Sequence, residues 1–243
     1  MATANFFGGG IGGVGKTLCT LTAATYHVIR ELDFALFDGD WENPNVYLSY
    51  PASESEADSQ DQVSCTIAYF TESDEHLQSV NEIFNAAGEK PTLVNLPAGT
   101  FRSFTDWLER KNVFRIAKAG GVDFKMWFLT DGSTDSLGVL VNSLQYFDGR
   151  MPHVVVKNHG RGRDWSKLES KKLQALLDAH NVKVIDFPEF TGKRELEEIR
   201  TQHIPFEQFL KKDLGLFEKL SVRDFLDKAW DAFDKAGGFS NGD

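Results

Sequence analysis

Apolar and polar positions follow two periods that alternate along this chain. Short apolar runs typical of buried strands occur at residues 4–7, 34–37, 91–95, 124–129, 153–156 and 182–187. Between them, apolar positions three or four residues apart predict helices at residues 18–32, 75–87, 101–117, 133–147, 165–180, 194–200 and 221–236. Residues 65–69 fit a short edge strand or a turn. This alternation predicts an α/β fold with a mostly parallel sheet that helices flank on both faces.

The segments between and after these elements indicate where loops, the domain and a C-terminal tail lie. Residues 51–62 are acidic and poor in apolar anchors, which predicts an exposed, mobile loop. Ser133 or Thr134 is placed to cap the helix that follows it. The chain shows no internal repeat and no linker composition. We therefore expect one domain over residues 1–236 and a flexible tail over residues 237–243.

Composition narrows the function without naming it. The 243 residues carry a net charge of −10, which argues against a protein that binds polyanions over its whole surface. The two cysteines are too few for a disulfide framework and predict a reducing, cytoplasmic setting. We see no signal peptide at the N-terminus, and no apolar stretch is long enough to span a bilayer.

A phosphate-binding loop gives the strongest chemical signal. Residues 10–17 read Gly-Ile-Gly-Gly-Val-Gly-Lys-Thr, a full G-x-x-x-x-G-K-[ST] match between a predicted strand and a predicted helix. In such a loop the backbone N–H groups and the helix N-terminus bind phosphate. Lys16 can reach the β- and γ-phosphates, and the Thr17 hydroxyl can ligate Mg²⁺. The alternative is a glycine turn with a structural role only. Such a turn would not need the Lys and Thr of the full pattern, so we predict a nucleotide site.

Polar residues at the ends of the other strands are expected to face this loop, because ligands bind beyond the carboxyl ends of parallel strands. Asp38 and Asp40 follow the second predicted strand, where carboxylates can hold Mg²⁺ and orient an attacking water. An ordinary Asp-Gly turn is the alternative interpretation. Asn95 stands where phosphate-loop enzymes usually carry an acid, so it supplies no charge to a metal.

Further residues are candidates for the γ-phosphate and the base. Gly99 can offer a backbone N–H near the γ-phosphate. Asn158, at the end of the strand at residues 153–156, has an amide that can both donate to and accept from an adenine edge. Pro188, after the last predicted strand, can wall the base. A lone Asn at a strand end is otherwise a common turn residue.

Together these residues resemble the ParA/MinD group of deviant Walker-A ATPases, which are P-loop NTPases of the SIMIBI type. The matching segments are residues 12–17 (Gly-Gly-Val-Gly-Lys-Thr), residues 37–40 with Asn45 beyond them, residues 96–99 (Leu-Pro-Ala-Gly) and residues 155–158 (Val-Val-Lys-Asn). The resemblance covers residues 4–190. Within the group, the chain looks like the plasmid conjugation and mobilisation branch of TraL, StbB and MobD-like proteins.

The resemblance implies ATP and Mg²⁺ as cofactors and an ATP-dependent homodimer. It implies catalytic roles for Lys16, Asp38 and Asp40, and metal binding by Thr17, Asp38 and Asp40. The implied nucleotide contacts are Gly12, Gly13, Val14, Gly15, Lys16, Thr17, Leu18, Asn158 and Pro188. Two positions depart from the pattern. Ile11 replaces the signature lysine, and Asn95 replaces the strand-end acid, which predicts a slow or partner-stimulated ATPase.

Three functions follow from these observations. The leading hypothesis is an ATP-binding, slowly hydrolysing switch that recruits a partner or a DNA complex in plasmid partition, stability or mobilisation. The alternatives are a nucleotide-binding scaffold without turnover and a metabolic phosphoryl-transfer enzyme. Residues 157–172 hold several basic side chains around Trp165, so this segment contacts DNA phosphates or forms a solvated surface.

Overall fold

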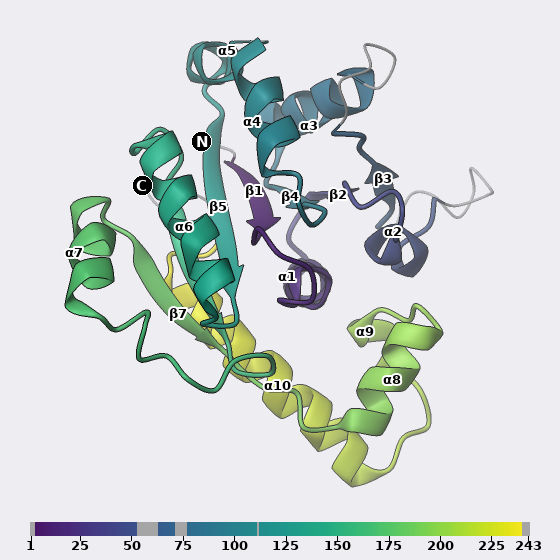
Figure 1. Ribbon diagram of the computed structural model, residues 1–243. Coiled ribbons are helices and arrows are strands. Elements are labelled where there is room, and N and C mark those ends of the chain that lie inside the picture. The colour runs from purple at the N-terminus through teal and green to yellow at the C-terminus, as the bar shows by residue number, and fades with distance from the viewer. Residues whose placement is uncertain (1–2, 53–62, 71–76, 111, 240–243) are drawn as a thin grey trace.

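A single sheet of seven parallel strands organises the computed structural model, which describes residues 3–52, 63–70, 77–110 and 112–239 (Figure 1). The strand order is β3-β2-β4-β1-β5-β6-β7, and every described pairing is parallel. The strands are β1 (Thr3–Gly8), β2 (Ala35–Asp38), β3 (Cys65–Ile67), β4 (Thr92–Asn95), β5 (Asp123–Thr130), β6 (His153–Asn158) and β7 (Lys183–Phe187). The predicted parallel α/β fold is confirmed. Residues 65–69 contribute an edge strand, β3, and not only a turn.

Helices cover both faces of this sheet. One face carries α1 (Lys16–Ile29), α2 (Asn45–Ser49), α8 (Lys193–Thr201), α9 (Phe206–Phe209) and α10 (Leu216–Lys235). The other carries α3 (Leu77–Glu89), α4 (Phe101–Arg110), α5 (Val113–Gly120), α6 (Thr134–Phe147) and α7 (Lys171–Ala179). Within the described ranges, no helix has the length and apolarity needed to cross a bilayer.

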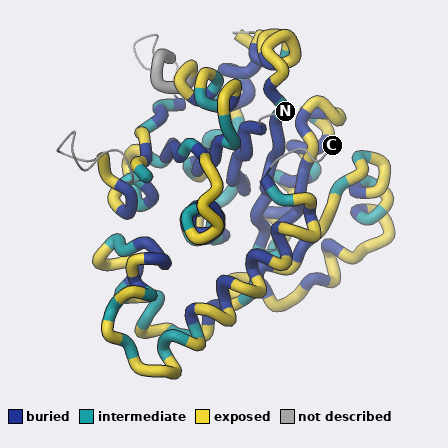
Figure 2. Tube along the Cα trace, turned by 180° about the vertical axis from the view of Figure 1, so that it is seen from behind, coloured by how far each residue is buried: buried dark blue, intermediate teal, exposed yellow. Residues whose placement is uncertain are grey.

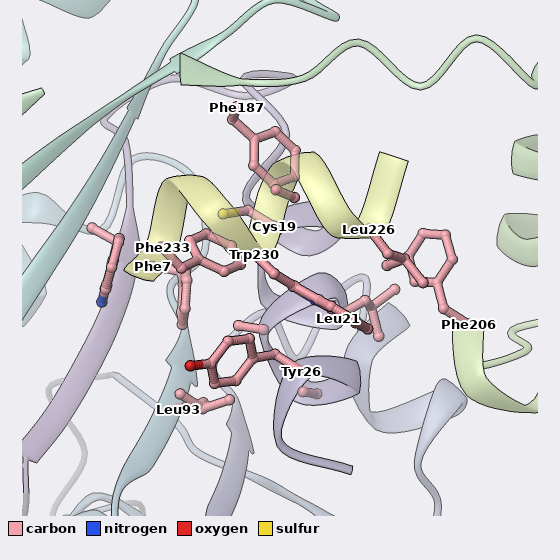
Figure 3. Packing of buried hydrophobic residues seen from close by; sticks show 14 of the residues in the cluster. Phe7, Cys19, Leu21, Tyr26, Leu93, Phe187, Phe206, Leu226, Trp230 and Phe233 are labelled. Atoms are coloured by element: carbon pink, nitrogen blue, oxygen red, sulfur yellow. The ribbon is translucent and has the colours of Figure 1, made fainter. Parts of the chain in front are cut away.

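The alternation of side chains along each strand divides the interior into two cores. Phe6 belongs to the core beneath α3–α7, whereas its neighbour Phe7 belongs to the core beneath α1 and α10. In Figure 3, Trp230 and Phe233 of α10 lie close to Phe7 and Tyr26. Figure 2 shows that α10 alternates buried and exposed positions along its length, as an amphipathic helix on a sheet does.

Two predicted helices are divided or shortened in the structure. The helix expected over residues 101–117 is two helices, because Asn112 adopts a left-handed backbone with φ of 49° and ends the first run. The helix expected over residues 165–180 begins only at Lys171. Ser170 before it has an extended backbone that interrupts the helical path from Trp165. Periodicity continues across both interruptions, so it gave no sign of them.

Other sequence expectations have mixed outcomes. Ser133 is the N-cap of α6, and its hydroxyl accepts the Ser136 N–H at 3.3 Å.

The short helices α2 and α9 were not predicted, because five and four residues are too few to show a period. Most of the predicted acidic loop, residues 53–62, and the start of the predicted helix, residues 75–76, lie outside the described residues.

The predicted tail at residues 237–243 does not include its first three residues. Phe239 is 3% exposed and packs against Phe7 and Trp127. Its carbonyl accepts the Asn5 side-chain amide at 2.9 Å, and the Gly238 carbonyl accepts Lys125 Nζ at 2.9 Å. Apolar burial and two hydrogen bonds therefore fix this segment to the core. Residues 240–243 lie outside the described residues.

His153, at the start of β6, makes folding stability sensitive to acid. Its ring lies 2.8 Å from Ser143 Oγ and 2.7 Å from the Met151 carbonyl. Burial lowers the pKa of His153 from 6.5 to about 4, although the Met151 contact opposes this shift. A histidine pKa lowered by folding contributes stability above the unfolded-state pKa, and this is lost as the pH falls toward the folded-state pKa.

We therefore expect His153→Gln to flatten the pH dependence of unfolding. Between pH 6.5 and 4, the free energy of unfolding should change by about 3 kcal/mol less in the variant than in the native chain. Urea titrations across this range measure the difference. Gln145→Ala, which changes an exposed residue of α6 that does not titrate, is the control and should retain the native pH dependence. Parallel curves for native chain and His153→Gln would contradict this assignment.

Candidate nucleotide-binding site

The phosphate loop joins the carboxyl end of β1 to the start of α1. Gly13 and Gly15 adopt left-handed backbones with φ of 79° and 98°, a conformation that side chains disfavour. A side chain at Gly15 would also collide with the Asn158 amide. The loop therefore needs glycine at position 15 both for its turn and for the close approach of β6.

Lys16 lies over the loop that it belongs to. Its Nζ donates to the Ile11 carbonyl at 3.1 Å, and the residue is only 7% exposed. Burial lowers the pKa of Lys16 below its usual value, while the nearby Asp40 charge acts in the opposite direction. An ammonium group with so little water around it gains strongly from an anionic ligand.

A pocket of about 310 Å³ opens in front of the loop. The predicted site residues that line it are Gly12, Gly13, Gly15, Lys16, Thr17, Leu18 and Asp40. Its far wall is α8 and the residues after it, including Leu196, Glu197, Arg200 and His203. The structure thus brings together the loop, the carboxylate after β2 and a wall from the C-terminal part of the chain. Val14 is buried in the core and does not line this pocket.

Asp38 is buried beside the pocket and braces the segment that carries Asp40. Its Oδ1 accepts from the Asp40 N–H at 3.1 Å, and its Oδ2 accepts from the Val46 and Tyr47 N–H groups at 2.9 and 3.1 Å. It thereby fixes the start of α2. Burial raises the pKa of Asp38, and the hydrogen bonds it accepts partly offset this effect. Its predicted catalytic and metal-binding roles stay predictions, since protein donors already occupy both oxygens.

Asn95 is the fourth donor to this carboxylate. Its Nδ2 donates to Asp38 Oδ1 at 2.8 Å, and its Oδ1 lies 3.5 Å from Thr20 Oγ1 of α1. An amide therefore fills the strand-end position and joins β4, β2 and the first helix. The neutral residue at this position is a partner of Asp38 and satisfies a buried charge that a second acid would repel.

Asn158 lies against the loop from the other side. Its Nδ2 donates to the Val14 carbonyl at 2.7 Å, and its Oδ1 accepts the Gly160 N–H at 3.0 Å. These contacts hold the loop and the end of β6 together. The predicted adenine contact of Asn158 stays a prediction. So does that of Pro188, which is half-buried and is not part of the pocket lining.

The buried carboxylate of Glu207 anchors the α8–α9 wall to α1 and to the residue that follows α2. Glu207 of α9 accepts hydrogen bonds from Thr25 of α1 and from Tyr50 after α2, both at 3.0 Å. Burial raises the pKa of this carboxyl. No sequence motif predicted a functional role for this wall. Arg200 and His203 were missed, and Arg161 was seen only as part of a basic segment.

Three of the seven Lys, Arg and His side chains in the basic segment 157–172 lie within ion-pair distance of carboxylates. Lys157 lies 3.5 Å from Glu169 and 3.4 Å from Asp186, and Arg163 lies 3.4 Å from Glu189. His159 lies 2.6 Å from Asp186. Pairing with carboxylates reduces the positive potential available to DNA phosphates. The DNA contact stays a prediction.

The donors at the pocket suit Mg²⁺ when phosphates supply the remaining ligands. Thr17 provides a hydroxyl and Asp40 a carboxylate, both lining the pocket, and Mg²⁺ prefers oxygen ligands with several waters or phosphates. Among the described residues, no group of three or more His, Cys, Asp or Glu forms a metal site. These residues therefore fit a nucleotide-bound Mg²⁺ better than a protein-only metal cage.

Comparison with known proteins agrees with this geometry. No family model matches the sequence. MobD of Acidithiobacillus ferrooxidans is 26% identical over 188 residues, which cover 76% of this chain and 77% of MobD. The septum site-determining protein MinD of Pyrococcus horikoshii, solved with Mg-ADP, is 16% identical with a TM-score of 0.56 over 97% of both chains. A variant of McdA from Cyanothece in complex with ATP is 13% identical with a TM-score of 0.57, over 100% of this chain and 99% of McdA. The chain therefore has the fold of the MinD-type P-loop ATPases, which confirms the predicted resemblance to the ParA/MinD group.

Proposed function

We propose that this chain is an ATP-binding switch protein that hydrolyses ATP slowly and recruits a protein partner or a DNA complex in the cytoplasm. The observation that carries the proposal is that Lys16, Thr17 and Asp40 line the same pocket. Lys16 and the loop N–H groups would bind the phosphates, with Thr17 and Asp40 holding Mg²⁺. The Mg-ADP and ATP bound to MinD and McdA support the choice of nucleotide.

The similarity to MobD supports a role in plasmid mobilisation, with partition or plasmid stability as related settings. If ATP binding causes two copies of the chain to form a homodimer, the partner can distinguish the ATP-bound dimer from the free monomer. Size-exclusion chromatography with light scattering, with and without ATP, tests this step. A monomer under both conditions would remove the homodimer from the proposal.

Slow turnover follows from two residues near the pocket. Ile11 adds no cation to the loop, and the amide of Asn95 is used to hold Asp38. The transition state of phosphoryl transfer depends on positive charge and metal around the γ-phosphate, so fewer charged groups predict a lower rate. The same observation favours a second candidate, a nucleotide-binding scaffold that does not hydrolyse ATP.

Asp40→Ala separates these two candidates. Asp40 lines the pocket and its Oδ1 accepts the Asn43 N–H at 3.3 Å, so its carboxylate is placed to orient water. We expect the variant still to bind ATP, because Lys16 and the loop N–H groups remain, and to lose turnover by about 100-fold or more. Phosphate release under single-turnover conditions measures this loss. Asp33→Ala, which removes a surface carboxylate paired with Lys90, is the control and should leave turnover unchanged.

Each outcome of this experiment has a clear meaning. A native chain that binds ATP without turnover would identify the scaffold. An Asp40→Ala variant as fast as the native chain would show that another group positions the water. A metabolic phosphoryl-transfer enzyme would instead consume ATP only in the presence of a small acceptor, whereas a switch would be stimulated by its protein partner or DNA.

A further inference from the structure

We infer that Arg161 binds the phosphates of the nucleotide from within the same chain; this rests on the proposed function. Arg161 lies in the turn that follows β6. Its backbone N–H donates to the Asn158 carbonyl at 3.0 Å, and the Asn158 side chain donates to the Val14 carbonyl at 2.7 Å. Two hydrogen bonds thus connect the backbone of Arg161 to the phosphate loop.

The turn around Arg161 is held tightly. The Gly162 N–H also donates to the Asn158 carbonyl, at 2.9 Å. A side chain at Gly162 would collide with the Asp131 carbonyl and with the Trp165 ring. The chain therefore has little freedom to move Arg161 away from the loop. The position of its Cα is set by the same contacts that shape the nucleotide site.

Arg161 lines the pocket together with Gly12, Gly13 and Lys16. An arginine side chain is long, always charged, and presents a planar fork of N–H donors that fits two phosphate oxygens at once. Ile11 is packed against the core and contributes no charge, so a cation elsewhere on the pocket lining would add to the charge of Lys16. Arg200, on the opposite wall, already lies 4.0 Å from Glu197.

Charge pairing distinguishes Arg161 from its neighbours. Lys157 and Arg163 each lie within ion-pair distance of a carboxylate, as described above. Arg161 forms no ion pair with any residue in the described part of the chain, although it lies on an acidic protein. An unneutralised guanidinium beside a phosphate loop is arranged to meet an anion that comes with the ligand.

Calorimetric titration with ATP and competition with inorganic tripolyphosphate test the inference on the full chain. We expect Arg161→Gln to weaken binding of both ligands by about ten- to a hundredfold, with Arg161→Lys in between. Arg163→Gln is the matched control, because Arg163 lies two positions away on the same exposed segment and is paired with Glu189. It should bind both ligands as the native chain does. Unchanged melting temperatures would show that these surface changes do not unfold the protein.

The outcomes separate this inference from the proposed function. If the native chain binds ATP and Arg161→Gln binds it equally well, Arg161 is not a phosphate ligand while the proposed function stands. If ATP binding weakens but tripolyphosphate competition does not, Arg161 contacts the base or ribose and the inference is wrong. If the native chain binds no ATP, the proposed function fails and this inference fails with it.

Discussion

Lys16→Ala is expected to lose at least about 100-fold in ATP affinity while the chain stays folded. The lysine ammonium would make charge-assisted hydrogen bonds to the phosphates, and each such bond contributes about 1.5–3 kcal/mol. The fold should tolerate the change, because the buried ammonium already has a lowered pKa and donates only to a loop carbonyl. We expect the free energy of unfolding to change by no more than about 1 kcal/mol. Isothermal titration calorimetry and urea unfolding measure the two quantities.

Lys125 provides the matched control for this variant. It is equally buried, has a pKa lowered by burial, donates to the Gly238 carbonyl, and does not line the pocket. Lys125→Ala should keep native ATP affinity. If Lys16→Ala were to bind ATP as tightly as the native chain, the glycine-rich loop would be structural and the proposed function would be wrong.

Asn95→Asp, which restores the acid usual at this strand end, is expected to destabilise the fold. It would place a second carboxylate where an amide now donates to Asp38 at 2.8 Å, with both residues buried. Two carboxylates this close cannot both ionise, so the pKa of the pair rises above the unfolded value of about 3.9. The penalty is absent below that value and grows as the pH rises through the raised folded-state pKa. At pH 8 we expect a loss of about 3 kcal/mol in the free energy of unfolding.

Urea unfolding between pH 5 and pH 8 checks this expectation. The difference between variant and native chain should shrink as the pH is lowered, because the pair then takes up a proton. Asn142→Asp, on the exposed side of α6, is the control and should show a change within about 0.5 kcal/mol at every pH. Native stability of Asn95→Asp at pH 8 would show that Asp38 does not depend on a neutral partner.

The sequence was sufficient for the fold because its signals are local and repeated. Strand-like runs such as that of Phe6 and Phe7 alternate with helical periods, and right-handed crossovers then leave few arrangements. Helix boundaries depended on single backbone conformations at Asn112 and Ser170, which no periodicity records. The burial of Phe239 depends on contacts with β1 and β5 that are distant in sequence.

The site was predictable where it is continuous in sequence. The glycine-rich loop carries its own geometry, and Asp40 follows a strand whose end must face that loop. The sequence could not show that Asp38 holds the segment after β2 in place, because the groups that donate hydrogen bonds to it come from α2 and β4. The α8 wall is placed at the pocket by tertiary contacts such as the hydrogen bond between Glu207 and Thr25. In the sequence, its residues have the pattern of an ordinary solvent-exposed helix.

The central place of β1 in the sheet has a consequence for how the chain reaches its native state. Ala4 pairs with Thr92 on one side and with Phe124 on the other, partners that lie 88 and 120 residues further along the chain. Contacts this distant in sequence form slowly, because long loops must close before they stabilise anything. We therefore expect the phosphate loop to take its shape late in folding. ATP should then leave the rate of refolding unchanged, because its site does not yet exist in the folding transition state. It should slow the unfolding of the native protein, where the site is formed.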